Sequence, residues 1–183
     1  MNSPQDLQIS YASVGRRIAA YLTDYAILFS VLIPLQVLMW VAGKGFPYTL
    51  FKSGWQVELW VLFSISLPVW LYFAFSEHSS RRATLGKRLF RIQVMRPSGD
   101  KIGFERAVIR TAIKLLPWEL THLTLLVPVP IWWDSSPEIR FGLIAVYVLI
   151  AIYLITMVVN KRRQSLHDIL VDTVVIRQPG VGL

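Results

Sequence analysis

The sequence predicts an all-α integral membrane bundle of about four transmembrane helices, with a small cytoplasmic β element and a basic amphipathic helix. Three observations lead to this fold class. Of the 183 residues, 54% are hydrophobic, and the mean hydropathy is +0.49, far above the values typical of soluble proteins. Four segments are apolar over about 20 residues, the length needed to cross a bilayer. Two short β-rich runs lie in the polar parts of the chain.

The four apolar segments differ in strength. The fourth contains no charge and is the clearest, whereas the third is weaker because it carries several prolines together with Glu119 and His122. The first is interrupted by Asp24, and Pro68 predicts a kink in the second. In chain order, the predicted spans are residues 18–41, 57–75, 115–133 and 141–159.

The basic residues indicate the orientation in the membrane. Of the nineteen Lys and Arg, all but Lys44, Lys52 and Arg140 lie before the first span, between the second and third, or after the fourth. Cytoplasmic loops carry the excess of such residues, so both termini and the middle loop are expected in the cytoplasm. An even number of crossings must then follow the middle loop, either two full spans or a re-entrant arrangement. The net charge of +8 is explained by topology and by contacts with anionic lipid headgroups, so we expect no nucleic-acid partner.

The middle loop, residues 76–114, is expected to carry β structure. Residues 90–95 alternate apolar and polar side chains as a strand does, and a turn at 97–100 would lead into a return strand at 101–104. A hairpin alone is marginally stable in water. Residues 173–177 form another β-rich run without a partner, so we expect them to join as a third strand.

The end of the same loop predicts an amphipathic basic helix. From residue 104 to 116, Arg106, Arg110 and Lys114 recur every four residues opposite apolar side chains. This pattern is typical of a helix whose basic face lies among lipid headgroups, here at the entrance to the third span. A solvated face that only sets the topology explains most of the same charge.

No motif points to catalysis. Cysteine is absent, and the stretch around Lys87 lacks the glycine spacing of a phosphate-binding loop. Ser165, His167 and Asp168 have the residue types of a hydrolase triad, but they are so close in sequence that their side chains diverge. The three histidines lie on different segments without the spacing of metal ligands. We therefore expect no enzyme activity, no cofactor and no metal.

Two charges stand in or next to the first span. Arg17 and Asp24 are two helical turns apart, so both project from one face of the helix. An ionisable group at the bilayer centre costs about 2.5–3.5 kcal/mol on insertion scales. Asp24 therefore needs a partner: Arg17, Tyr21, a basic residue of the 106–114 helix such as Arg110, or water. The pair predicts either a buried ion pair that fixes helix packing or an ion or proton site.

A third charge of interest is Asp168. Ser165 followed by this acid three residues later is a capping box, which opens a short helix just past the fourth span. Asp168 is expected to cap this helix, to meet Arg17, or both, because a carboxylate has several acceptor sites. His167 and Glu119 are the further titratable groups expected to support this network.

Three ordered segments of the chain resemble the RDD family, small polytopic bacterial membrane proteins named for one arginine and two aspartates. Matched residue by residue, the name-giving positions fall on Arg17, Asp24 and Asp168. The chain departs from the pattern at Asp172, where a small residue is usual, and in its long, proline-rich third segment. The first segment is Gly15-Arg-Arg-Ile-Ala-Ala-Tyr-Leu-Thr-Asp24. The middle one comprises Thr84-Leu-Gly-Lys-Arg-Leu89, Arg91-Ile-Gln-Val94, Ser98-Gly-Asp100 and Arg106-Ala-Val-Ile-Arg110. The last is Arg163-Gln-Ser-Leu-His-Asp168 with Thr173-Val-Val175.

The resemblance implies one membrane domain over residues 11–177, with flexible tails at 1–10 and 178–183, in the bacterial inner membrane. It implies transport of an ion or small solute, including sodium–proton exchange for some members. For this chain, we expect such transport through the buried Arg/Asp network. Four short spans line a very small pathway, so transport also predicts a homo-oligomer or a membrane protein partner. The alternative is a non-catalytic accessory, scaffold or assembly protein that binds a partner through its basic cytoplasmic face.

Overall fold

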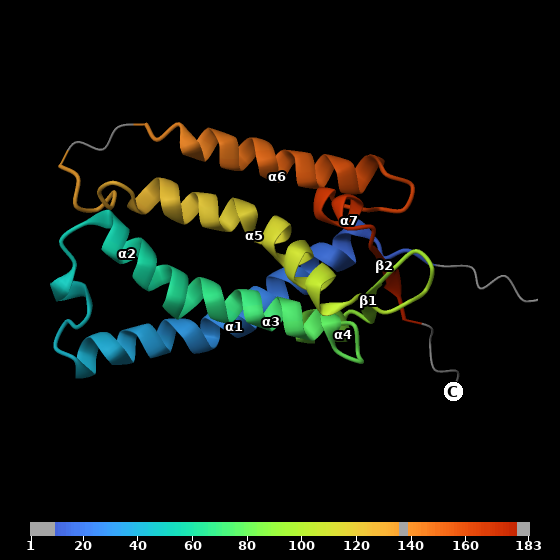
Figure 1. Ribbon diagram of the computed structural model, residues 1–183, viewed down its shortest axis with the longest axis horizontal. Helices are drawn as coiled ribbons and strands as arrows, with labels where there is room; N and C mark the ends of the chain where they lie inside the picture. The colour runs from blue at the N-terminus through green and yellow to red at the C-terminus, as the bar shows by residue number, and fades with distance from the viewer. Residues whose placement is uncertain (1–9, 136–138, 179–183) are drawn as a thin grey trace, which may run out of the picture.

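The computed structural model in Figure 1 describes residues 10–135 and 139–178. Helices run back and forth along its long axis: α1 runs outward, α2 and α3 return in series, α5 runs outward again and α6 returns. The helices are α1 (Val14–Ala42), α2 (Gly54–Val61), α3 (Leu67–His78), α4 (Leu85–Leu89), α5 (Phe104–Leu126), α6 (Gly142–Val159) and α7 (Leu166–Leu170), with a 3-10 turn η1 (Tyr48–Leu50), a π-helical turn η2 (Leu62–Ser66) and strands β1 (Ile92–Met95) and β2 (Val174–Arg177).

Three helical stretches of the described chain are long and apolar enough to cross a membrane. They are Val14–Ala42, Gly54–His78 and Gly142–Val159, which agree with the predicted first, second and fourth spans. Most of their apolar side chains point outward; Leu22 and Val31 of α1, for example, are each 62% exposed. Such outward apolar faces are suited to contact with lipid.

The predicted third span merges with the predicted basic helix into the single helix α5. Even its most apolar stretch retains Arg110, Lys114 and Glu119, so α5 is not among the three long apolar helices. The expected continuation to residue 133 is wrong. The helix ends at Leu126, and the prolines at 128 and 130 cannot donate the backbone hydrogen bonds that would extend it.

The second long stretch changes its helical geometry before Pro68. The turn η2 is π-helical, and the Leu67 N–H donates to the carbonyl of Leu62, five residues earlier. Proline removes one α-helical donor and crowds the preceding turn, which accounts for this irregularity at the predicted position.

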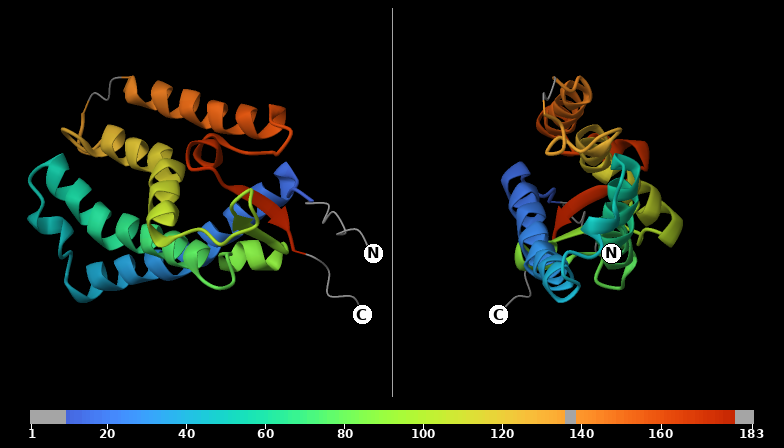
Figure 2. Two further views of the ribbon diagram at one scale, coloured as in Figure 1. Left: turned by 45° about the vertical axis from the view of Figure 1, so that its right-hand side comes forward. Right: turned by 90° about the vertical axis from the view of Figure 1, so that its left-hand side faces the viewer.

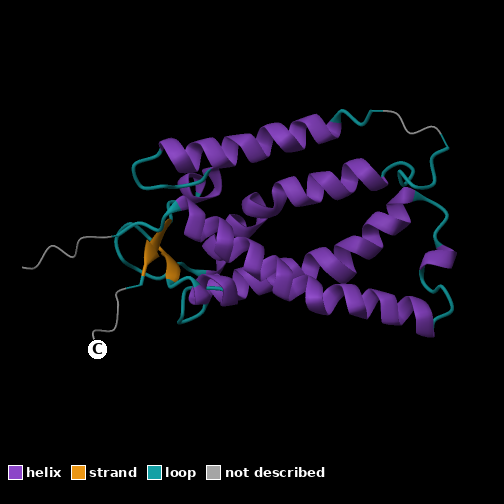
Figure 3. Cartoon of the chain, turned by 180° about the vertical axis from the view of Figure 1, so that it is seen from behind, coloured by secondary structure: helices purple, strands orange, loops and turns teal. Residues whose placement is uncertain are grey.

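A small antiparallel sheet closes one end of the bundle (Figure 3). Strand β1 pairs with β2, so the predicted union of the C-terminal strand with residues 90–95 is confirmed. The predicted return strand at 101–104 is wrong, because α5 begins at Phe104 and Ile102 is buried in the core under the sheet. The third contribution comes instead from the N-terminal side, where Tyr11 forms a single bridge with Ile176.

The sheet, α4 and α7 gather at the same end of the molecule, which we call the sheet end (Figure 1). Figure 2 shows β2 beside the start of α1, where the Ala12 N–H donates to the Val175 carbonyl at 2.9 Å. The predicted flexible tails lie outside the described residues except for Ser10 and Gln178. Both of these make backbone hydrogen bonds, with Arg177 and Arg91 respectively.

Gly86 of α4 packs directly against the backbone of α1, so a larger residue at this position should destabilise the fold. A Cβ atom there would lie 2.2 Å from the Ala20 carbonyl oxygen of α1, a backbone atom that cannot move aside. We expect Gly86→Ala to lower the free energy of unfolding by about 1–3 kcal/mol, measured by thermal unfolding in detergent. Gly15→Ala is the control, because a Cβ at Gly15 meets no atom within 4 Å. Equal stability of the two variants would contradict the close packing of α4 on α1.

Candidate functional site

A cluster of buried charges lies inside the sheet end, and Asp168 of α7 is one of its two centres. Its carboxylate pairs with Arg17 of α1 and with Arg110 of α5, whose Nη2 lies 2.6 Å from Asp168 Oδ1. Thr173 Oγ1 donates to Oδ1 at 3.1 Å, and the Ser165 N–H donates to Oδ2 at 3.2 Å. Asp168 therefore has both roles expected of it: it caps α7 and it pairs with Arg17.

The second centre is Glu77, near the end of α3. It is fully buried and pairs with three cations: Arg110 Nη1, Lys87 Nζ at 2.5 Å and Lys114 Nζ at 3.0 Å. Glu77 is not among the site residues predicted from the sequence. Its only signal was an acid at the predicted inner end of the second span, directly before a strongly basic loop.

The basic face of α5 points into the protein. The sequence predicted that Arg106, Arg110 and Lys114 would face lipid headgroups, but Arg110 is 1% exposed and Lys114 is also buried. Two buried carboxylates on α3 and α7 attract these cations more strongly than the surface does. Arg106 is half-buried and donates to the carbonyl of Val171 at 2.7 Å.

Asp24 of α1 is buried separately from this cluster. It accepts hydrogen bonds from Tyr72 Oη at 2.6 Å, Thr84 Oγ1 at 2.6 Å and the Gly86 N–H at 2.7 Å. None of the expected protein partners takes this role. Arg17 leans toward the N-terminus of its helix, as helical side chains do, and reaches Asp168 instead. The structure thus joins Arg17 to Asp168 and uses Asp24 to tie α1 to α3 and α4.

The remaining predicted site residues lie at different distances from the cluster. His167 is buried beside Asp168, with Nε2 at 3.7 Å from Oδ2, and its Nδ1 has no hydrogen-bond partner among the described residues. The hydroxyl of Tyr21 bonds to that of Tyr25 at 2.9 Å. Glu119 lies elsewhere and accepts from Trp70 Nε1 at 2.9 Å and Ser66 Oγ at 3.1 Å.

The environment shifts the titration of the two groups on α7. Burial alone would raise the pKa of Asp168, but the guanidiniums of Arg110 and Arg17 outweigh it and hold the pKa well below its usual range. Burial lowers the pKa of His167 well below its ordinary value, and the neighbouring Asp168 carboxylate offsets only part of that shift. Asp168 is thus charged and His167 neutral near pH 7.

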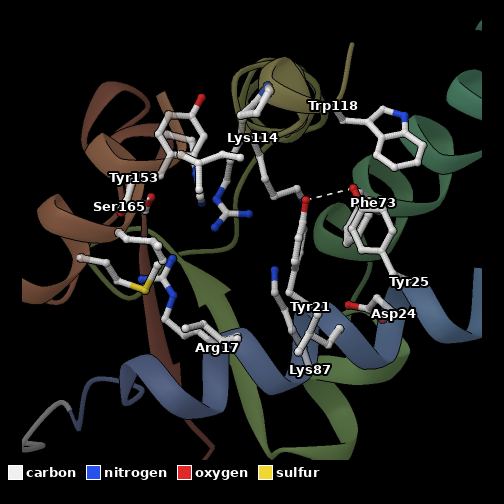
Figure 4. Close-up of a pocket in the computed structure, with 18 of the residues that line it drawn as sticks. Arg17, Tyr21, Asp24, Tyr25, Phe73, Lys87, Lys114, Trp118, Tyr153 and Ser165 are labelled. Carbon is white, nitrogen blue, oxygen red and sulfur yellow. Dashed lines mark hydrogen bonds between the residues drawn. The ribbon is translucent and has the colours of Figure 1, made fainter. Parts of the chain in front are cut away.

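A cavity of about 670 Å³ adjoins the cluster, between α1, α5 and α6 (Figure 4). Its walls include four cationic side chains, of Arg17, Lys87, Arg110 and Lys114. Glu77 and Asp168 do not line it, because they sit behind these cations. Asp24 is the single carboxylate among the lining residues. The lining of the cavity therefore carries more cationic than anionic side chains, although Glu77 and Asp168 behind it balance part of this charge.

The long apolar helices and the buried charges between them define an α-helical membrane protein. The model of the RDD family matches residues 11–172, which is most of the chain. The chain therefore belongs to the RDD family, as its sequence segments predicted. No curated protein and no solved structure matches it. Within residues 10–135 and 139–178, no group of three or more His, Asp and Glu side chains is placed to hold a metal ion.

Neutralising Glu77 tests the central role of this carboxylate. Glu77→Gln leaves Lys87, Arg110 and Lys114 without their shared counter-charge, so we expect the free energy of unfolding to fall by about 3–5 kcal/mol. Asp172→Asn is the control, since Asp172 is exposed and lies 3.8 Å from Arg106; we expect a change within about 1 kcal/mol. Thermal unfolding in detergent measures both. A Glu77→Gln variant as stable as wild type would show that the cations do not depend on this carboxylate.

The buried neutral His167 predicts a pH-dependent stability. Its folded pKa lies below its unfolded value, so the unfolded chain takes up the proton first and stability is lost as pH falls below about 6.5. We expect wild type to lose up to about 1.4 kcal/mol per pH unit more than His167→Gln between pH 6 and 5. The Asp168 contribution changes only at lower pH. Denaturant unfolding at several pH values measures the difference, and parallel curves would contradict a neutral, buried His167.

Proposed function

We propose that this RDD-family protein transports an ion or small solute across the membrane, and that the cavity beside the charge cluster is where the solute binds. The supporting observation is that four cationic side chains line one cavity beside α1 and α6, two helices long and apolar enough to cross a membrane. Charges inside a membrane protein are costly and commonly mark solute pathways. Ion pairs made only for packing would not need an adjoining cavity.

The cations have donor capacity beyond the ion pairs. Lys114 Nζ makes one hydrogen bond within the described chain, to Glu77, and stands 3.5 Å from the centre of the Phe73 ring. An ammonium group has three donors. Lys114 can therefore keep its ion pair and still bind a solute in the cavity.

The same ion pairs also hold the fold together, and this role does not conflict with transport. They connect α1 and α5 to α7 through Asp168, and α5 to α3 through Glu77. Such a frame keeps the cavity walls in place while a solute enters and leaves. Pre-organised charges of this kind lower the reorganisation that binding requires.

An accessory or assembly protein stays the alternative proposal. It depended on a basic surface, and Lys87, Arg110 and Lys114 contribute little to one because they point inward. The exposed side chains of Arg81 and Arg88 still line a shallow depression at the sheet end, next to the exposed Leu85 and Leu89. A stable complex recovered after gentle solubilisation, and lost on Arg81→Glu with Arg88→Glu, would favour this alternative.

Flux through proteoliposomes tests transport directly. Vesicles with an internal pH dye and a chloride-sensitive dye receive gradients of Na⁺, K⁺ or Cl⁻, and we expect flux above protein-free vesicles for at least one of them. Leu22 lines the cavity, so the larger side chain of Leu22→Trp should take up space in which the solute is proposed to bind and reduce that flux about tenfold, equivalent to about 1.4 kcal/mol.

The control for the flux measurement is Val31→Trp. Val31 lies on the same helix with the same 62% exposure as Leu22 but does not line the cavity. Its flux should equal that of wild type. Flux no greater than in protein-free vesicles for every gradient, or equal flux in the Leu22→Trp and Val31→Trp variants, would overturn transport through this cavity.

A further inference from the structure

We infer that the cavity binds an anionic amphiphile, with a carboxylate or phosphate headgroup at its cationic end and an alkyl chain along its apolar wall. This inference rests on the proposed function, since it names the ligand class of the same cavity. Three features of the cavity carry it: the sign of its charge, its unused polar groups and the exposure of its apolar side.

The charge of the lining favours an anion. Four cationic side chains face the cavity, and the one carboxylate among them, Asp24, already accepts three hydrogen bonds. Glu77 and Asp168 lie behind and are occupied by three and two cations respectively. A metal cation would therefore find no free carboxylate, whereas an anion meets ammonium and guanidinium donors.

Several polar groups on the lining have capacity for a headgroup. The Lys114 ammonium keeps donors free, and Tyr21 places its hydroxyl in the same space, bonded to Tyr25 (Figure 4). His167 also lines the cavity, but its unpartnered Nδ1 is itself buried and does not reach the open space. The groups available to a headgroup oxygen are therefore the Lys114 ammonium and the Tyr21 hydroxyl.

Part of the lining is apolar and belongs to the outward faces of α1 and α6. Leu22 of α1 and Leu154 of α6 contribute to this part, and their side chains are 62% and 41% exposed. Ile150 and Met157 continue the same wall along α6. Both helices are long enough to cross a membrane, so an alkyl chain could stay in lipid while its headgroup enters between them. The alkyl chain would hold the amphiphile in the membrane by about 0.8 kcal/mol per methylene relative to water.

A free inorganic anion shares the headgroup chemistry but uses only the cationic half of this site. The apolar wall favours the amphiphile as the source of the anion. A suitable probe is dibromostearate, whose bromines quench tryptophan fluorescence at short range. Trp118 lines the cavity and reports on it directly.

The experiment uses the full chain in nanodiscs of zwitterionic phosphatidylcholine at pH 7, because burial lowers the pKa of Lys114 to about 7. Dibromostearate should quench more strongly than its uncharged methyl ester at equal membrane concentration, and Trp118→Phe should remove the difference. Unbrominated stearate should displace the probe, whereas acetate and inorganic phosphate should not. Equal quenching by acid and ester would overturn the inference, and displacement by acetate or phosphate would assign the site to free anions.

Two pairs of variants separate headgroup from chain. Lys114→Gln should weaken dibromostearate binding about tenfold, the loss of one charge-assisted hydrogen bond, while Arg88→Gln, exposed and outside the cavity, should not. Leu154→Phe keeps every charge and should also weaken binding, with the exposed Ile155→Phe as its control. This second pair decides the matter if Lys114→Gln does not fold, and unchanged binding in Leu154→Phe would overturn the inference.

Binding and flux give distinguishable results. Specific dibromostearate binding without ion flux in proteoliposomes would uphold the ligand class and overturn ion transport. Flux that is blocked by Leu22→Trp, without preferential binding of the anionic probe, would uphold transport and overturn the ligand class.

Discussion

The rest of the sheet end depends on the paired contacts of the Arg110 guanidinium. This group lies between Asp168 and Glu77, two buried carboxylates from helices far apart in the sequence. A buried guanidinium loses its hydration, and only well-placed acceptors make its position tolerable. Thr173 provides a further acceptor, at 3.2 Å from Arg110 Nε. Removing either carboxylate would leave the buried Arg110 guanidinium with only part of its counter-charge and no water to replace it. The arrangement of α3, α5 and α7 that supplies both carboxylates is therefore favoured over others.

The three name-giving positions of the family divide into two separate arrangements. Arg17 and Asp168 belong to the charge cluster, where they help to fix α7 against the start of α1. Asp24 instead receives neutral donors, from Tyr72, Thr84 and the backbone of Gly86. A carboxylate satisfied by hydroxyl and amide donors needs no counter-ion nearby. One arginine and two aspartates therefore do not form one ion site in this chain.

Sequence patterns predicted the features that are determined by residues close together in the chain. Hydropathy predicted the three long apolar helices, and residue spacing predicted the cap at Ser165. Glu77 was missed, and Arg110 and Lys114 were placed on the wrong side of α5, because periodicity defines a helical face but not what that face meets. The meeting of this face with Glu77 depends on how α3 packs beside α5. The predicted return strand at 101–104 is wrong for a similar reason. The sheet is extended by Tyr11, which is far from β1 in the sequence, and not by the residues that follow β1.

The pairing of β2 with β1 and with Tyr11 also constrains the order in which the chain folds during its synthesis. The strand that completes the sheet is Val174–Arg177, and Asp168 precedes it by only a few residues; both follow α6 in the chain. While the ribosome is still synthesising α6, Arg17 and Arg110 have no Asp168 to meet. The Asp168 half of the charge cluster can therefore form only after α1, α5 and α6 have been synthesised. Until then, Arg17 lacks its carboxylate partner, whereas Arg110 can already pair with Glu77 of α3.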